Sequence, residues 1–282
     1  VGICYPLFEG MVWGKITLLG QPDSWLAEIS GGIPFHDYAG SVVVHSMGGW
    51  IALAGIIVLG PRLGRWDSEG RSRPIPISNF PFMALGSWML CVGWFGFNVM
   101  SAATIQGISG LVAINSLFAM AGGIISSLLI SKNDPGFIHN GALAGLVAIC
   151  AGSDQVHPIG ALVIGAVSGV IFVKGFIWEQ EKLKIDDVLG VWPLHGIAGT
   201  WGGIACGIFG QESLGGLGEV SLKAQMIGSL TAIVVALFFG FTVYKILDAT
   251  VGIRLTKEAE QRGSDLTLHK IESYPEDASS RF

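Results

Sequence analysis

The sequence predicts an all-α polytopic membrane protein, and three observations lead to this fold class: the composition, a series of long apolar stretches and one repeated motif. Hydrophobic residues make up 51% of the 282 residues and charged residues only 13%, whereas soluble domains carry roughly one quarter charged residues. The net charge of −5 comes largely from the loops and the C-terminal end. It gives no reason to expect a nucleic acid as a partner.

About eight stretches are long and apolar enough to cross a membrane, because a hydrocarbon layer of ~30 Å needs about 20 residues of helix. The first is the weakest, since it carries Glu9 and Lys15, and the fifth is short. The break between the third and the fourth is soft, because residues 81–131 carry no charge. In chain order the predicted spans are residues 1–20, 38–60, 80–102, 105–131, 136–152, 158–177, 188–209 and 222–247.

Small residues are frequent inside these stretches. We expect most of the 42 glycines to let neighbouring helices pack closely. The four cysteines occur singly in apolar segments, without the spacing of a metal site. We interpret all of them as small core residues: Cys4, Cys91, Cys150 and Cys206.

The chain divides into a transmembrane domain, residues 1–250, and a polar C-terminal tail, residues 251–282. Short cytoplasmic loops are enriched in Lys and Arg. These residues concentrate in the tail and in loops 60–74 and 173–184, and they are absent from residues 20–37, 151–158 and 210–221. Eight spans that alternate between the two kinds of loop place the C-terminus in the cytoplasm.

The first residue is valine, and the chain enters a hydrophobic stretch at once. No positively charged signal-peptide region precedes that stretch. We therefore expect an N-terminal part of the protein to be missing.

One motif occurs twice. "DYAGSVVVH" covers residues 37–45 and "DVLGVWPLH" covers residues 187–195, and both follow D-x-x-G-x-x-x-x-H. On the predicted topology the first copy begins at the outer end of a span and the second at the inner end of another. The two copies therefore run in opposite directions.

Each aspartate of the motif, Asp37 and Asp187, is placed to cap a helix N-terminus with its carboxylate. Eight residues on, His45 and His195 lie about 12 Å deeper at 1.5 Å per residue, near the middle of the membrane. Copies of opposite direction indicate an inverted-topology repeat, and transporters of that design carry their substrate along the repeat interface.

Several segments resemble the ammonium transporters of the Amt/Mep/Rh family, and its Amt branch in particular. The resemblance covers about residues 5 to 275 and rests on the two histidine motifs together with "GWFGFNVMSA", "NGALAGLVAI" and the tail "VGIRLTKEAEQRGSDLTLHKIESY". It implies an inverted-repeat fold of eleven helices in homotrimers, with one narrow hydrophobic pore in each subunit. On that pattern this chain begins at the fourth helix and lacks the first three.

The resemblance also implies roles for single residues of the pore. His45 and His195 match the paired pore histidines, whose imidazoles share a hydrogen bond along the lumen. Phe97, in "GWFGFN", resembles the remaining one of two stacked phenylalanines that close the pore, and Trp94 in the same segment is a supporting residue.

An outer recruitment site is implied in the same way. Trp13, in "GMVWG", and Ser101, in "NVMSA", resemble the aromatic wall and the hydroxyl that hold an ammonium ion by cation–π attraction and a hydrogen bond. Asp37 matches an acid below that site, and Asp187 is the supporting acid of the second copy.

Plainer interpretations stand beside these roles. A histidine inside a span can be a packing residue, although ionisable groups at membrane depth are costly and usually functional. Capping alone explains Asp37 and Asp187 equally well. Trp13 fits the interfacial aromatic belt, and Ser101 could bond back to its own helix.

The implied activity is transport of ammonium or ammonia, with methylammonium as an analogue. We expect NH4+ to bind outside, to lose a proton, and to pass as ammonia along the dry lumen; electrogenic and neutral transport both remain open. The tail resembles the cytoplasmic region that packs on a neighbouring subunit and docks PII signal proteins.

Two other functions are weighed against transport. A sensor of the same family is the first alternative. A His-ligated membrane metal protein is the second, but the spans offer almost no further ligands and no H-E-x-x-H. We therefore expect no enzyme activity, no catalytic residues, no metal and no cofactor.

Overall fold

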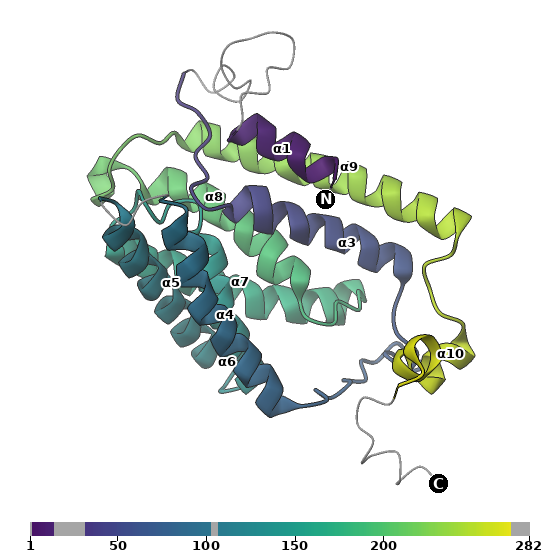
Figure 1. Cartoon of the computed structure of the whole chain (residues 1–282). Coiled ribbons are helices and arrows are strands. Elements are labelled where there is room, and N and C mark those ends of the chain that lie inside the picture. Colours follow the sequence, from purple (N-terminus) through teal and green to yellow (C-terminus); the bar gives the residue numbers. More distant parts are fainter. Residues whose placement is uncertain (1, 14–31, 103–106, 272–282) are drawn as a thin grey trace.

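The computed structural model describes residues 2–13, 32–102 and 107–271 of the chain. Every regular element in these ranges is helical, and one isolated bridge joins Trp66 to Ser72 in a loop. The all-α prediction is therefore confirmed. The long helices lie beside one another in a bundle, with the short helix α10 at one end (Figure 1).

The helices follow the order of the predicted spans. Three short π-helical turns interrupt or extend them: Ser41–Ser46, Glu179–Leu183 and Trp192–Ile197. The α-helices are α1 (Cys4–Val12), α3 (Met47–Leu59), α4 (Phe80–Met100), α5 (Ser109–Ile130), α6 (Pro135–Ile149), α7 (Pro158–Trp178), α8 (Ala198–Phe209), α9 (Leu222–Thr250) and α10 (Lys257–Arg262).

Five of the predicted spans are confirmed by length and apolarity: Ser41–Leu59, Phe80–Met100, Ser109–Ile130, Pro158–Leu183 and Leu222–Thr250. α6 is shorter, and α8 reaches a comparable length only together with its π turn. Of the weakest prediction, residues 1–20, the structure describes α1, whereas Lys15 lies outside the described residues.

Side chains with hydrogen-bonding atoms mark where the spans begin. Asn79 accepts the N–H of Phe82 at the start of α4, and Asp134 accepts the N–H of Phe137 at the start of α6. Proline occupies the first turn of α4, α6 and α7, where its missing N–H costs nothing. His157 caps α7 by accepting the N–H of Ile159.

The soft break between the third and fourth spans is real, since α4 ends at Met100 and α5 begins at Ser109. α5, α6 and α7 pack on one another, and α9 packs on α1, α3 and α8. A Cβ atom at Gly165 of α7 would overlap the carbonyl of Ala119 in α5. Close helix packing through glycine is therefore confirmed at this contact.

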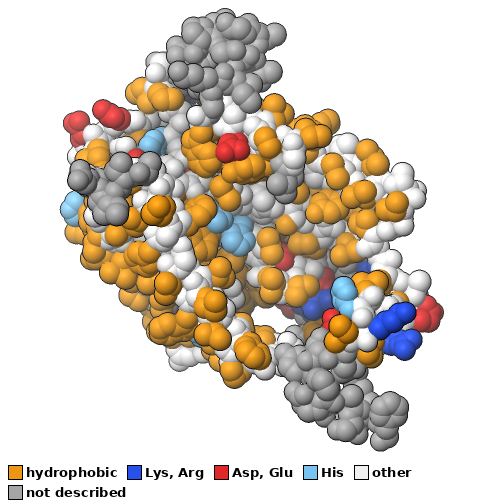
Figure 2. Space-filling view, viewed as in Figure 1, with side chains coloured by type: hydrophobic (Ala, Val, Ile, Leu, Met, Phe, Trp, Pro, Cys, Tyr) orange, Lys and Arg blue, Asp and Glu red, His pale blue; other side chains and the backbone are white. Residues whose placement is uncertain are grey.

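α4 is the least buried of the long helices. Its outer face is strongly apolar and exposed, including Trp88 (68% exposed), Val92 (73%) and Met100 (70%). Figure 2 shows hydrophobic side chains spread over this part of the surface, with Lys and Arg gathered near α10.

The tail folds back onto the loop that follows α3. Glu260 of α10 accepts the backbone N–H of Leu63 at 2.8 Å and pairs with Arg254 at 2.9 Å, while Arg254 also donates to the carbonyl of Leu59. The Leu63 N–H and the Arg254 guanidinium hold the pKa of Glu260 below its usual range. α10 is therefore attached by contacts that need an ionised Glu260.

Acid should release α10. A carboxyl group whose folded pKa is depressed stabilises the docked state above its unfolded pKa, and that stabilisation is lost as pH falls through the folded pKa. We expect Glu260→Gln to raise hydrogen–deuterium exchange over residues 257–262 at neutral pH, as acid does in the parent. Glu258→Gln, on an exposed neighbour, is the control. Equal exchange in the two variants would contradict the docking role of Glu260.

Candidate functional site

The repeated motif folds into the same local structure in both copies. In the first copy one carboxylate oxygen of Asp37 accepts the backbone N–H groups of Val42 and Val43, at 2.9 and 2.7 Å. Gly40 has a φ of 96°, in the left-handed region that glycine enters without strain. The N–H of His45 then donates to the carbonyl of Gly40, five residues back, at 3.0 Å.

The second copy repeats this arrangement. Asp187 accepts the N–H of Trp192 at 2.8 Å, and Gly190 has a φ of 68°. His195, like His45, lies in a π-helical turn at the start of its helix. Such turns contain one extra residue per turn and occur frequently at functional sites. Both aspartates thus accept N–H groups of the first turn, although the N-cap positions themselves are Gly40 and Val191.

Glycines four residues after each histidine bring the two copies together. A Cβ atom at Gly49 would overlap the backbone nitrogen of Gly196, the residue after His195. A Cβ atom at Gly199 would lie 2.7 Å from the backbone nitrogen of Ser46, the residue after His45. The same contact is thus made in both directions, as a two-fold relation between the copies requires.

This crossing brings the two imidazoles together at their Nδ1 edges. The Nδ1 atoms of His45 and His195 are 3.3 Å apart, and the ring planes differ by 22°. A hydrogen bond between two Nδ1 atoms needs one donor and one acceptor, so the pair shares a single proton at this position. The other nitrogen of His45, Nε2, is buried without a hydrogen-bond partner among the described residues.

Aromatic side chains from α4 surround the pair. Trp94 stacks on His45 with ring centroids 5.0 Å apart and an interplanar angle of 20°, and Phe97 lies 5.6 Å from the same imidazole. Trp94 is buried, whereas Phe97 is 40% exposed. The structure therefore brings together four of the predicted site residues.

The two residues of the predicted outer site, Trp13 and Ser101, each bind a backbone carbonyl. The indole N–H of Trp13 donates to the carbonyl of Asp37 at 2.7 Å, so Trp13 lies beside the first motif. The hydroxyl of Ser101 donates to the carbonyl of Phe97 in its own helix, as in the plainer interpretation. Among the described residues, no hydrogen bond or ring contact links Trp13 with Ser101.

Hydroxyl groups next to the histidines were missed by sequence reasoning. The hydroxyls of Ser46 and Thr200 lie 2.8 Å apart, and Trp50 donates its indole N–H to Thr200. Ser46 directly follows His45, and Thr200 lies five residues after His195. Their place beside the motif is the only signal that could have found them.

His36 directly precedes the first motif. It pairs with Asp154 at 2.9 Å, and Gln225 binds both its N–H and its carbonyl. Burial lowers the pKa of His36, but the hydrogen bond and charge of Asp154, together with the charges of Asp37 and Glu219, outweigh it, so the net shift is upward. The pair fixes the segment that leads into Asp37.

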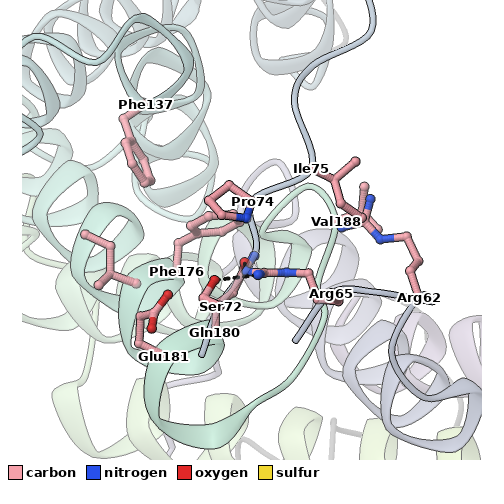
Figure 3. Close-up of a pocket in the computed structure, with 11 residues that line it drawn as sticks. Arg62, Arg65, Ser72, Pro74, Ile75, Phe137, Phe176, Gln180, Glu181 and Val188 are labelled. Atoms are coloured by element: carbon pink, nitrogen blue, oxygen red, sulfur yellow. Dashed lines mark hydrogen bonds between the residues drawn. The ribbon is translucent and has the colours of Figure 1, made fainter. Parts of the chain in front are cut away.

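A cavity of about 250 Å³ lies away from the histidines, between the arginine-rich loop and the end of α7 (Figure 3). Arg65 points into it, but its guanidinium already donates to Gln180 and Ser72. Arg62 pairs with Asp186 at 2.8 Å. These arginines therefore hold the loop on the bundle.

The fold and the site define a multi-pass membrane protein in which two inverted copies of one motif meet at paired imidazoles. The model of the Ammonium Transporter Family matches residues 1–274, and the chain belongs to this family.

Individual relatives agree with this assignment. Ammonium transporter Amt2 of Methanocaldococcus jannaschii is 44% identical over 98% of this chain and 62% of its own length. A solved structure of a sensor Amt protein has a TM-score of 0.86 and 33% identity, covering 95% of this chain and 67% of that one. Mep2 from Candida albicans has a TM-score of 0.76 at 25% identity, covering 97% and 61%. The chain thus spans about three fifths of the Amt2 relative.

The glycine crossing can be tested by adding one methyl group. Gly49→Ala should destabilise the protein by about 1–3 kcal/mol, as overpacking does, because the new Cβ meets backbone that cannot rotate away. Gly48→Ala is the matched control, since a Cβ there meets nothing within 4 Å. Thermal unfolding in detergent measures both. Equal melting temperatures of the two variants would show that the two copies can move apart at this contact without loss of stability.

Proposed function

We propose that this protein transports ammonium, with ammonia passing along the histidine pair. The observation that carries the proposal is the 3.3 Å contact between the Nδ1 atoms of His45 and His195. Two ionisable side chains at membrane depth are costly and mark substrate pathways. Their duplication in inverted copies is typical of transporters that work at a repeat interface.

The chemistry of the cargo favours neutral imidazoles. Ammonium resembles potassium in size and charge, so a ring of carbonyl groups would separate the two ions poorly. A dry apolar path rejects both ions unless the cargo gives up its charge, and only ammonium can lose a proton. The products are NH3, which continues along the path, and H+, which the imidazole nitrogens accept or pass on.

The residues around the pair have matching roles in this proposal. Trp13 is 44% exposed, and its ring offers a cation–π contact to an arriving ion. Trp94 and Phe97 exclude water from His45, so that ammonia rather than the hydrated ion meets the imidazole. Asp37 and Asp187 orient the turns that carry the histidines.

Ammonium sensing is a second candidate function. It is supported by the likeness to the sensor Amt protein at a TM-score of 0.86. A sensor would bind ammonium at the same residues without passing it at a transporter's rate. Flux measurements across a sealed membrane separate the two functions.

We further propose a homotrimer with a cytoplasmic C-terminus, in which PII signal proteins dock near the tail. The exposed apolar surface of α4 supports contacts with lipid or another subunit. The concentration of arginine in residues 60–74, next to the docked α10, supports the cytoplasmic placement of this end.

Topology can be tested with single cysteines at exposed positions. Asp37 and Asp187 are unsuitable, because they are 2% and 1% exposed. We expect Ser213→Cys to react with an impermeant thiol reagent from outside intact cells, and Ser68→Cys only after permeabilisation. The parent protein, treated in the same way, shows how much labelling comes from its own four cysteines. Labelling of both variants from the same side would contradict the proposed topology.

The histidines can be tested in the complete protein in proteoliposomes. Replacing His45 and His195 by leucine removes the acceptor nitrogens, so methylammonium uptake should fall by about a hundredfold, as loss of a proton acceptor typically does. His139→Leu is the control, since this histidine contacts Ser87 and Phe80 instead. Parental uptake and parental discrimination against potassium in the double variant would end the proposed mechanism.

A further inference from the structure

The helix that carries Trp94 and Phe97 is held by few contacts. In α4 only Ser87, Trp94 and Asn98 are buried. Trp94 and Asn98 are one helical turn apart and face the bundle together. What fixes these two side chains therefore fixes the aromatic wall of the histidine site.

A series of hydrogen bonds between buried polar groups leads from Trp94 into the bundle. The indole N–H of Trp94 donates to the sulfur of Cys150 at 3.3 Å, and the thiol lies 3.2 Å from the side-chain carbonyl of Asn98. The amide of Asn98 then donates to Ser116, at 2.9 Å, and Ser116 donates to the backbone carbonyl of Val112. The thiol also lies 3.1 Å from the backbone carbonyl of Leu146, and its single proton can go to either acceptor. When the thiol donates to Asn98, the indole, the thiol, one amide N–H of Asn98 and the Ser116 hydroxyl each have an acceptor.

Cys150 also contacts the first motif through its backbone. Its carbonyl accepts the N–H of Ala39 at 2.9 Å, within the segment between Asp37 and Gly40 that begins the His45 turn. One residue thus binds both the indole stacked on His45 and the segment from which the His45 turn starts. The contact with Ala39 is made by the backbone, whereas the contact with Trp94 depends on the sulfur, and a thiol that only fills space in the core would lack it.

We propose that Cys150 is a positioning residue of the transport site, whose sulfur holds Trp94 in its stack on the His45 imidazole. The effects on transport that we expect from this role rest on the proposed function. Without the sulfur, the indole N–H and the Asn98 carbonyl lose their partners inside a dry core, where unpaired polar groups are costly. The Trp94 indole then turns toward other hydrogen-bond acceptors and leaves its stack on the His45 imidazole.

A second cysteine provides a matched control. Cys206 is 1% exposed and, among the described residues, its thiol makes no hydrogen bond with another side chain. It packs beside Gly152, where a Cβ would lie 3.2 Å from it. Replacing Cys206 removes a buried thiol without touching Trp94.

Transport should respond differently to three substitutions in the complete protein. Cys150→Ala should lower the maximum rate of methylammonium uptake by about tenfold, since a small misplacement near the chemistry is costly, while half-saturation stays unchanged because Trp13 is untouched. Cys150→Ser keeps an acceptor and a donor and should recover most of the rate. Cys206→Ala should match the parent. A parental rate in Cys150→Ala, or no recovery in Cys150→Ser, would overturn the proposal.

A measurement that does not depend on transport separates this inference from the proposed function. With 5-fluorotryptophan incorporated, the 19F resonance of Trp94 is identified by its loss in Trp94→Phe. That resonance should move in Cys150→Ala, and it should stay near its parental position in Cys150→Ser and Cys206→Ala. An unmoved Trp94 resonance in Cys150→Ala overturns the positioning role, even if the parent transports nothing.

Discussion

The close backbone contact at Gly49 and Gly199 is the constraint on which the site depends. Each glycine lies four residues after a histidine and meets the residue that follows the other histidine. Any side chain at these positions would push the copies apart and separate the imidazoles, which are 3.3 Å apart at Nδ1. The capped π turns then set the direction of each ring. The packing of the two inverted copies and the geometry of the histidine pair both depend on this contact.

Several polar groups in the apolar interior near the histidines find a hydrogen-bond partner, as most buried polar groups do. The aspartates of the motif bind backbone N–H groups, Ser46 pairs with Thr200, and Trp94 binds Cys150. These bonds fix side chains near the histidines in single positions. The Nε2 of His45 is one of several buried side-chain atoms without a partner among the described residues, and in the proposed function this nitrogen meets the cargo.

Much of the fold could be predicted, because apolar length and capping residues carry local information. The spacing of Asp37, Gly40 and His45, repeated downstream, placed the histidines at one depth. The π turns could not be predicted, since no residue type specifies them. Cys150 appeared to be a packing residue because its partner Trp94 lies 56 positions away. The role of Ser101 in an outer site stays a prediction, and its hydroxyl donates to a carbonyl of its own helix.

The 3.3 Å contact between the Nδ1 atoms of His45 and His195 requires that the two imidazoles share one proton. Nitrogen-15 NMR of histidine-labelled protein tests it most directly, because a coupling between two nitrogens across a hydrogen bond requires that bond to exist. We expect a cross-peak between one protonated and one unprotonated Nδ1, which disappears in His195→Leu. Two uncoupled imidazoles, each with its own tautomer, would contradict it.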